Sequence, residues 1–194
     1  MSTPDDRWLD RWLALVADRA AGQPVLELGC GAGRDTEVLA GAGHLVVGLD
    51  LSPAQVDAAR SRAPSAQLSC QDVRDPFPAS AAQARVVVAS LSLHYFAWSE
   101  TVALVQRIRK LLLPNGLLLC RLNSTNDVHH GAVGHPEIEK DYYLVGDQPK
   151  RFFDRAAIET LFADGWRTLS LQEQTVQRYA RPKVLWEAVV ESVA

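Results

Sequence analysis

The chain has 194 residues, of which 47% are hydrophobic and 22% are charged, a composition typical of a folded globular protein and not of a disordered one. Its length favours a single domain over residues 1–194. The formal net charge of −3 disfavours binding to nucleic acid or to an anionic membrane, because both depend on clustered cations.

Cysteine spacing and apolar stretches bear on the cellular compartment. The three cysteines are far apart and form no CxxC pair, which excludes a disulfide framework and a thiolate zinc site. Asp5 and Asp6 stand where a secretory signal would carry basic residues, and Pro114-Asn115-Gly116 interrupts the longest apolar stretch. We therefore expect a cytoplasmic protein without a membrane span.

The first predicted element is an amphipathic helix over residues 1–22. A tandem Asp-Arg-Trp-Leu repeat places Trp8, Trp12 and Val16 on one helical stripe. Short apolar runs then alternate with helical patterns. The predicted strands cover residues 24–28, 44–49, 67–70, 84–90 and 117–122, and the predicted helices cover 34–42, 52–62 and 99–112, with Ser52 and Ser99 as N-caps.

These strands are continuously apolar, as a parallel sheet covered on both faces requires. The alternation of strand and helix predicts an α/β fold with a Rossmann-like, doubly wound sheet. Residues 123–151 are polar and show no periodicity, so we expect a long loop that forms a lid-like insertion. A helix capped by Asp154 follows, and the runs 166–172 and 183–190 predict a C-terminal antiparallel hairpin.

The most informative motif is a glycine-rich turn, Glu-Leu-Gly-Cys-Gly-Ala-Gly, at residues 27–33. It follows a predicted strand and precedes a predicted helix, where glycines let backbone amides approach a ligand closely. The spacing is G-x-G-x-G, whereas the dinucleotide fingerprint requires G-x-G-x-x-G or alanine at the last position. Arg34 occupies that last position, which disfavours a pyrophosphate site.

Two aspartates follow the next two predicted strands. Asp50 ends the second strand, where a carboxylate can accept hydrogen bonds from ribose hydroxyls. Asp72 follows the third strand and can accept the exocyclic amine of an adenine, while the amide of Val73 reaches a ring nitrogen. The glycine turn and the two aspartates together predict a site for an adenosine-containing ligand.

These motifs resemble those of the class I S-adenosylmethionine-dependent methyltransferases over nearly the whole chain. The run Gly33 to Thr36 looks most like the tellurite-resistance-type and related small-molecule enzymes. The resemblance implies a mostly parallel seven-stranded sheet of order 3-2-1-4-5-7-6. The matching segments are residues 27–33, Gly-Leu-Asp-Leu-Ser at 48–52, Gln-Asp-Val at 71–73, the strand ending in Ser90, and Leu-Leu-Leu-Pro-Asn-Gly-Leu-Leu-Leu at 111–119.

The resemblance also implies that S-adenosylmethionine is the cofactor. The backbone around Gly29 and Gly31 would hold the methionine part, Leu51 would lie along the adenine, and Ser90 would lie near the sulfonium. Arg34 is either a fork for the cofactor carboxylate or a surface residue, and Cys30 is a small filler and not a nucleophile. The predicted cofactor residues are Glu27, Gly29, Cys30, Gly31, Gly33, Arg34, Asp50, Leu51, Asp72, Val73 and Ser90.

Methyl transfer from a sulfonium needs no general acid, because the leaving group is a neutral thioether. A base is required only if the acceptor must lose a proton. The candidate catalytic residues are His94, Tyr95 and Asn123, with His94 either a base or a hydrogen-bonding part of the pocket wall. The insertion is either a lid whose histidines and tyrosines line the acceptor pocket or a solvated loop, and its spacing predicts no metal site.

We therefore predict a methyltransferase that acts on a small-molecule acceptor as a monomer or a homodimer. The negative net charge weighs against a polyanionic acceptor. Two alternatives stay open: a nicotinamide-dependent oxidoreductase, which Arg34 disfavours, and a non-catalytic module that binds the cofactor without turnover.

Overall fold

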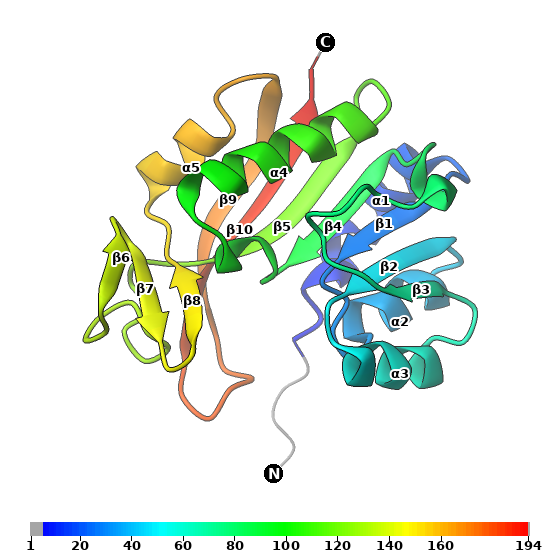
Figure 1. Ribbon diagram of the computed structural model, residues 1–194. Coiled ribbons are helices and arrows are strands. Elements are labelled where there is room, and N and C mark those ends of the chain that lie inside the picture. The colour runs from blue at the N-terminus through cyan, green and yellow to red at the C-terminus, as the bar shows by residue number, and fades with distance from the viewer. Residues whose placement is uncertain (1–5, 194) are drawn as a thin grey trace.

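The computed structural model describes residues 6–193 and confirms the predicted α/β architecture (Figure 1). Within these residues, seven strands form one sheet of order β3-β2-β1-β4-β5-β10-β9. The first five are parallel, and β10 runs antiparallel to both β5 and β9. The strands are β1 (Val25–Leu28), β2 (Val46–Asp50), β3 (Gln67–Cys70), β4 (Val86–Ser90), β5 (Leu117–Asn123), β9 (Trp166–Val176) and β10 (Lys183–Ser192).

Helices cover both faces of this sheet. The predicted first helix begins as a 3-10 turn, η1 (Trp8–Trp12), and continues as α1 (Leu13–Ala20); positions 1–5 of that prediction lie outside the described residues. The other helices are α2 (Arg34–Gly41), α3 (Pro53–Arg62), α4 (Trp98–Leu111), α5 (Arg155–Leu161) and the short 3-10 turns η2 (Ala79–Ala81) and η3 (Leu93–Tyr95).

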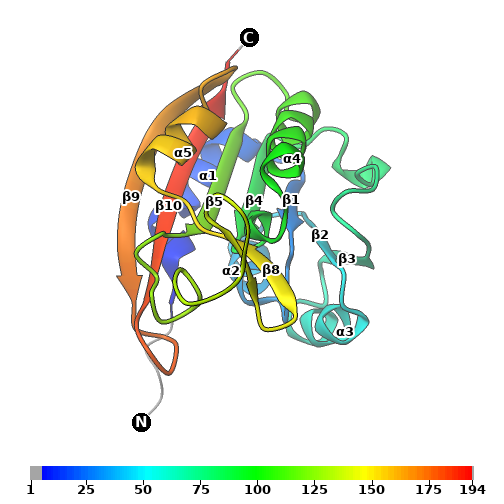
Figure 2. The same cartoon turned by 60° about the vertical axis from the view of Figure 1, so that its left-hand side comes forward.

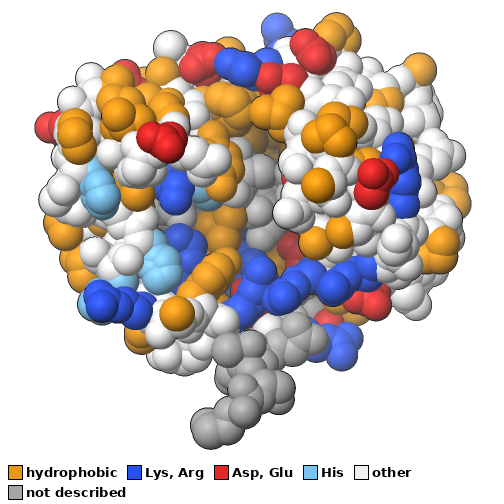
Figure 3. Space-filling view, turned by 60° about the horizontal axis from the view of Figure 1, so that its bottom comes forward, with side chains coloured by type: hydrophobic (Ala, Val, Ile, Leu, Met, Phe, Trp, Pro, Cys, Tyr) orange, Lys and Arg blue, Asp and Glu red, His pale blue; other side chains and the backbone are white. Residues whose placement is uncertain are grey.

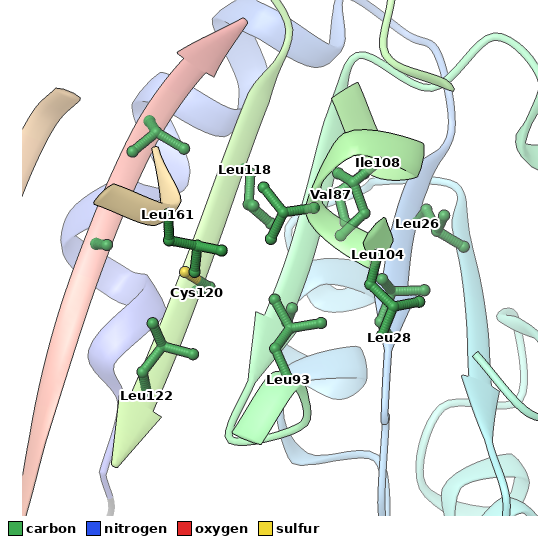
Figure 4. Packing of buried hydrophobic residues seen from close by; sticks show 14 of the residues in the cluster. Leu26, Leu28, Val87, Leu93, Leu104, Ile108, Leu118, Cys120, Leu122 and Leu161 are labelled. Atoms are coloured by element: carbon green, nitrogen blue, oxygen red, sulfur yellow. The ribbon is translucent and has the colours of Figure 1, made fainter. Parts of the chain in front are cut away.

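Strand β4 shows why the helices divide between two faces. Its side chains alternate, so that Val87 packs with α4 and α5 while Val86 and Val88 pack with α1 and α2. Figure 4 shows Val87 and Leu118 facing Ile108 of α4. Because both faces of the strand are buried, every position of β4 except its last is apolar and inaccessible. The sheet thereby becomes a rigid platform whose strand ends carry the polar residues.

The insertion between β5 and α5 is not the irregular loop that we predicted. It contains a three-stranded antiparallel sheet, β6 (Glu137–Glu139), β7 (Tyr142–Val145) and β8 (Gln148–Arg151), beside the main sheet (Figures 1 and 2). A two-residue turn, Gly146-Asp147, joins β7 to β8, with Gly146 at φ +62°. The apolar and aromatic run Tyr142–Val145, followed by Gly-Asp, is a sequence signal for a hairpin. The polar residues on either side of the run obscured this signal.

The start of α4 also differs from the prediction. Ser99 was expected to cap this helix, but α4 begins at Trp98 and no side chain next to it in the sequence caps it. The amide of Trp98 instead donates a 2.6 Å hydrogen bond to Oε1 of Glu139, from β6 of the insertion. A carboxylate from a distant segment thus satisfies a helix N-terminus.

The predicted caps at Ser52 and Asp154 are confirmed. Ser52 Oγ accepts from the amide of Gln55, and Asp154 Oδ1 accepts from the amide of Ala157 at 2.7 Å. Throughout residues 6–193, no helix has the length and apolar character that crossing a bilayer demands.

Candidate active site

The glycine turn between β1 and α2 has a backbone that only glycine adopts easily. Gly29 and Gly31 have φ values of +72° and +51°. A Cβ on Gly29 would lie 2.4 Å from the Cβ of Ser92, so the segment after β4 also requires a glycine there. Gly33, at φ +80°, lies against Ala59 of α3 and lines neither of the two cavities described below, so its role is in packing.

Asp50 ties this turn to the end of β2. Its Oδ2 accepts a 2.8 Å hydrogen bond from the amide of Gly31, and its Oδ1 accepts one of 2.9 Å from the amide of Ser52. The carboxylate is only half-buried and borders a cavity, so lone pairs remain for further donors. Asp50 therefore fixes the turn and also faces the ligand space.

Two neighbouring cavities, which share Gly29 and Gln55, meet at this turn. The first, of about 340 Å³, lies over the glycine turn and extends to the end of β4. The second, of about 930 Å³, lies beyond the ends of β2 and β3. Figure 3 shows the corresponding face of the molecule, which is deeply hollowed. The predicted residues lining the first cavity are Glu27, Gly29, Cys30, Gly31, Arg34 and Ser90, and those lining the second are Gly29, Asp50, Leu51, Asp72 and Val73.

Burial governs the ionisation of two residues of the first cavity. Glu27 is almost inaccessible, and burial, with the nearby Asp35 as a second cause, raises its pKa to about 8. Burial also raises the pKa of the Cys30 thiol to about 12, with the nearby Glu27 as a second cause. Cys30 is thus a thiol at neutral pH, in agreement with its predicted role as a filler.

Four residues around the first cavity escaped the sequence analysis: Asp35, Arg121, Arg178 and Tyr179. Arg121 is buried at the end of β5, and its Nε donates a 2.9 Å hydrogen bond to Ser90 Oγ. Asp35 accepts a 3.0 Å hydrogen bond from Trp8 Nε1. A guanidinium inside the otherwise apolar run of β5 was the available signal, because charged residues are seldom buried without a partner.

Of the predicted catalytic residues, Tyr95 borders one of the two cavities, whereas His94 and Asn123 line neither of them. Tyr95 lines the second cavity beside Tyr142 of the insertion, whose hydroxyl donates a 3.0 Å hydrogen bond to the carbonyl of Tyr95. His94 is buried, and the centroid of its ring lies 4.2 Å from the ring centroid of Tyr95. Burial lowers the pKa of His94 well below its usual range. Asn123 is buried and donates to the carbonyl of Arg151 at 3.4 Å. Catalytic roles for His94 and Asn123 stay predictions.

Among residues 6–193, no three histidine, cysteine, aspartate or glutamate side chains gather as a metal ion requires. His130 of the insertion contacts Tyr179, with the two ring centroids 5.5 Å apart.

The sheet order is that of the doubly wound class, and the polar residues at its strand ends suit a nucleoside-containing ligand. Residues 25–116 match a family described as "Methyltransferase domain". The chain is 34% identical over 136 residues to a trans-aconitate 2-methyltransferase of Delftia acidovorans, covering 68% of this chain and 50% of that protein. It is 32% identical over 96 residues to an uncharacterized methyltransferase of Synechocystis sp., covering 50% of this chain and 45% of that one.

Solved structures agree on the fold. A S-adenosylmethionine-dependent methyltransferase from Methanosarcina mazei superposes with a TM-score of 0.75 at 14% identity, over 92% of this chain and 97% of that one. The chain spans about half the length of the curated relatives it matches. The predicted resemblance is confirmed: the chain has the sequence motifs and the fold of class I S-adenosylmethionine-dependent methyltransferases.

The residues present fit S-adenosylmethionine as the cofactor. Gly29 and Gly31 line the first cavity with backbone that carries no side chain, which suits the close approach of a ligand. Glu27 supplies a carboxyl group at the first cavity, which suits the ammonium group of the cofactor. Asp50 supplies a carboxylate at the second cavity, which suits the ribose hydroxyls. When bound, the cofactor supplies an electrophilic methyl group on a sulfonium.

Proposed function

We propose that the protein transfers a methyl group from S-adenosylmethionine to a small-molecule acceptor. One observation carries the proposal: the hydrogen bond between the Gly31 amide and Asp50 joins the turn for the methionine part to the carboxylate for the ribose. The two cavities on either side of this contact can then receive the two ends of one extended ligand. The trans-aconitate relative acts, by its name, on a small molecule, which supports an acceptor of that size.

In this proposal the cofactor residues divide between its two ends. Glu27 receives the ammonium group, and Arg34 lies at the edge of the same cavity, near the cofactor carboxylate. Asp72 receives the adenine amine with Val73 beside it. Arg74 donates to both carboxylate oxygens of Asp72 and holds the pKa of that carboxyl below its usual range, so that Asp72 is an acceptor at neutral pH.

The protein contributes alignment and exclusion of water to the reaction. Ser90 and Ser92 lie at the end of β4, where the cavities meet, and Tyr95 and Tyr142 enclose the second cavity. Holding an acceptor in line for displacement supplies about 7–11 kcal/mol in well-oriented systems, without an acid or a base. The neutral His94 behind Tyr95 is a wall residue in this proposal, or a weak base for an acceptor that must lose a proton.

The compartment and assembly are part of the same proposal. The cysteines Cys30, Cys70 and Cys120 are all free, which supports a reducing environment such as the cytoplasm. We infer that the enzyme works there as a monomer or a homodimer, with neither nucleic acid nor a membrane as a partner.

Calorimetry with S-adenosylhomocysteine tests the cofactor site directly. We expect micromolar binding to the wild-type protein and at least about tenfold weaker binding to Asp50→Ala, because a charge-assisted hydrogen bond contributes about 1.5–3 kcal/mol. Asp57→Ala, which removes an exposed carboxylate of α3, is the matched control and should bind normally. Absence of binding to the wild type, or binding of NADH in its place, would contradict the proposal.

A further inference from the structure

Four cationic side chains from separate segments converge on the side of the site away from Asp50 and Asp72. We call them the cationic wall: Arg121 at the end of β5, Lys150 in β8, Arg178 in the β9–β10 turn and Lys183 at the start of β10. Arg121 and Arg178 line the first cavity together with Tyr179. Figure 3 shows lysine and arginine side chains gathered in and along the hollow on this face.

Tyr179 contacts two members of the group. The guanidinium of Arg178 lies 5.2 Å from the centroid of its ring, and Nζ of Lys183 lies 5.8 Å from the same centroid. Arg178 and Tyr179 line the cavity over the glycine turn. Lys183 is separated from that cavity by the ring of Tyr179. These cations therefore lie beside the space that the methyl group must face.

Lys150 brings the insertion into the same group. Strand β8 packs beside η3, which carries His94. Lys150 and Lys183 both help to lower the pKa of His94, so both charges lie near this buried ring. No ion pair to Lys150 is present within residues 6–193. Its ammonium group is thus available to a ligand.

Carboxylates near the cationic wall offset only part of its charge. Asp127 pairs with Lys183 at 2.8 Å, and Asp6 contacts Arg121 and lies 3.9 Å from Arg178. Asp35, which lines the first cavity with Arg121, also lies near that guanidinium. Three acids therefore lie among the four cations, although the chain as a whole carries a net charge of −3. Such a local excess of positive charge attracts anions and raises their local concentration.

We propose that the acceptor carries a small anionic group, a carboxylate or a phosphate, and that Lys150 and Arg178 bind it. The inference rests on the proposed methyl transfer and adds the chemical class of the acceptor. Lysine from β8 and arginine from the β9–β10 turn approach the group from two sides and donate charge-assisted hydrogen bonds. The buried pair Lys183–Asp127 positions the start of β10 and is not itself a ligand, since Asp127 Oδ1 also accepts from the Val184 amide at 3.1 Å.

The test uses the protein saturated with S-adenosylhomocysteine, titrated at low ionic strength. The probes are succinate, citrate and glycerol 3-phosphate, with succinamide and glycerol as uncharged counterparts. We expect at least one anion to bind and both uncharged probes to fail, and the anion that binds distinguishes a carboxylate from a phosphate acceptor. Lys150→Gln should weaken that binding at least about tenfold while leaving the affinity for S-adenosylhomocysteine unchanged, and Arg178→Gln should weaken anion binding to at least the same extent.

Lys140→Gln is the matched control, because Lys140 belongs to the same insertion and its side chain is 87% exposed. It should bind the anion as the wild type does. Binding of charged and uncharged probes alike, binding of none, or unchanged affinity in both Lys150→Gln and Arg178→Gln would overturn the inference. Failure of S-adenosylhomocysteine itself to bind would instead contradict the proposed function, so the two failures are distinguishable.

Discussion

Thr36 Oγ1 donates a 2.6 Å hydrogen bond to Oε2 of Glu27 beneath the glycine turn, where both side chains are buried. The contact orients Glu27 toward the first cavity from the end of β1. Burial nevertheless raises the pKa of this carboxyl to about 8, so that Glu27 is mostly protonated at neutral pH while the cavity holds no ligand. Cofactor binding and proton binding are therefore linked at one residue.

Ligand binding should release a proton. An ammonium group beside Glu27 stabilises the carboxylate, lowers its pKa and expels up to about one proton per ligand bound at pH 7. Calorimetry with S-adenosylhomocysteine in phosphate and in Tris measures this release, because the two buffers differ in ionisation enthalpy. Glu27→Gln should give equal binding enthalpies in both buffers, and equal enthalpies already in the wild type would contradict the prediction.

The same residue should make stability depend on pH. Between the ordinary pKa of 4.5 and the folded-state value of about 8, the folded protein holds more protons than the unfolded chain. The free energy of unfolding contributed by Glu27 therefore falls as the pH rises through this window. Urea titrations from pH 5 to 8 should show a flatter dependence in Glu27→Gln than in the wild type, whereas identical slopes would count against the assignment.

Gly29 and Gly43 form a matched pair for the glycine turn. Both have positive φ, but a Cβ on Gly29 would meet Ser92 at 2.4 Å while one on Gly43 would meet nothing within 4 Å. Gly43→Ala should lower the free energy of unfolding by about 1–2 kcal/mol and leave S-adenosylhomocysteine binding intact. Gly29→Ala should cost more stability and weaken binding at least about tenfold. Equal effects of the two variants would show that the contact with Ser92 is unimportant.

Trp8 gives the N-terminal segment a measurable role. Its Nε1 donates to Asp35, whose pKa is raised by burial, and its ring lies 4.9 Å from the guanidinium of Arg121. Trp8→Phe should lower the free energy of unfolding by about 1–3 kcal/mol more than Trp166→Phe does. Trp166 is the control because its buried Nε1 has no hydrogen-bond partner among the described residues. Urea denaturation of both variants provides the comparison, and equal losses would be inconsistent with a significant Trp8–Asp35 bond.

Glu139 couples the insertion to α4. Replacing it with alanine removes the acceptor for the Trp98 amide and the ion-pair partner of Arg151, at a cost of about 0.5–2 kcal/mol. Hydrogen exchange should accelerate at Trp98 and in β6 to β8, while β4 stays protected. Glu159→Ala removes an exposed carboxylate of α5 that pairs only with Arg155, and it should leave both regions unchanged. Unaltered exchange in Glu139→Ala would show that the insertion is held by other contacts.

The main sheet could be predicted because its signals are local. Strand β4 is continuously apolar over Val86 to Ala89, and caps such as Ser52 mark the helix ends, so neighbouring residues suffice to identify each element. The positions of Asp50 and Asp72 beside one cavity were predictable for the same reason, since each follows a recognisable strand. Their convergence on one side of the sheet follows from parallel strand direction alone.

The rest of the site depends on contacts between distant segments. Glu139 and Trp98 are 41 positions apart, and no pattern around Ser99 shows that the helix takes its cap from elsewhere. Net charge was similarly uninformative about the cationic wall. The chain is acidic overall, yet Arg178 is brought close to Arg121 only by the folded β9–β10 hairpin. Composition averages over the surface, whereas binding depends on where the charges lie.

The insertion leaves and rejoins the sheet at adjacent points. The amide of Phe153 donates a 2.8 Å hydrogen bond to the carbonyl of Asn123, and Ser124 pairs with Phe153, so its two ends lie side by side. A segment with neighbouring ends can be exchanged for another of different length without moving the strands around it. Replacing residues 125–152 would therefore change the side chains that this segment brings to the second cavity, while the β1–α2 turn and Asp50 stay in place.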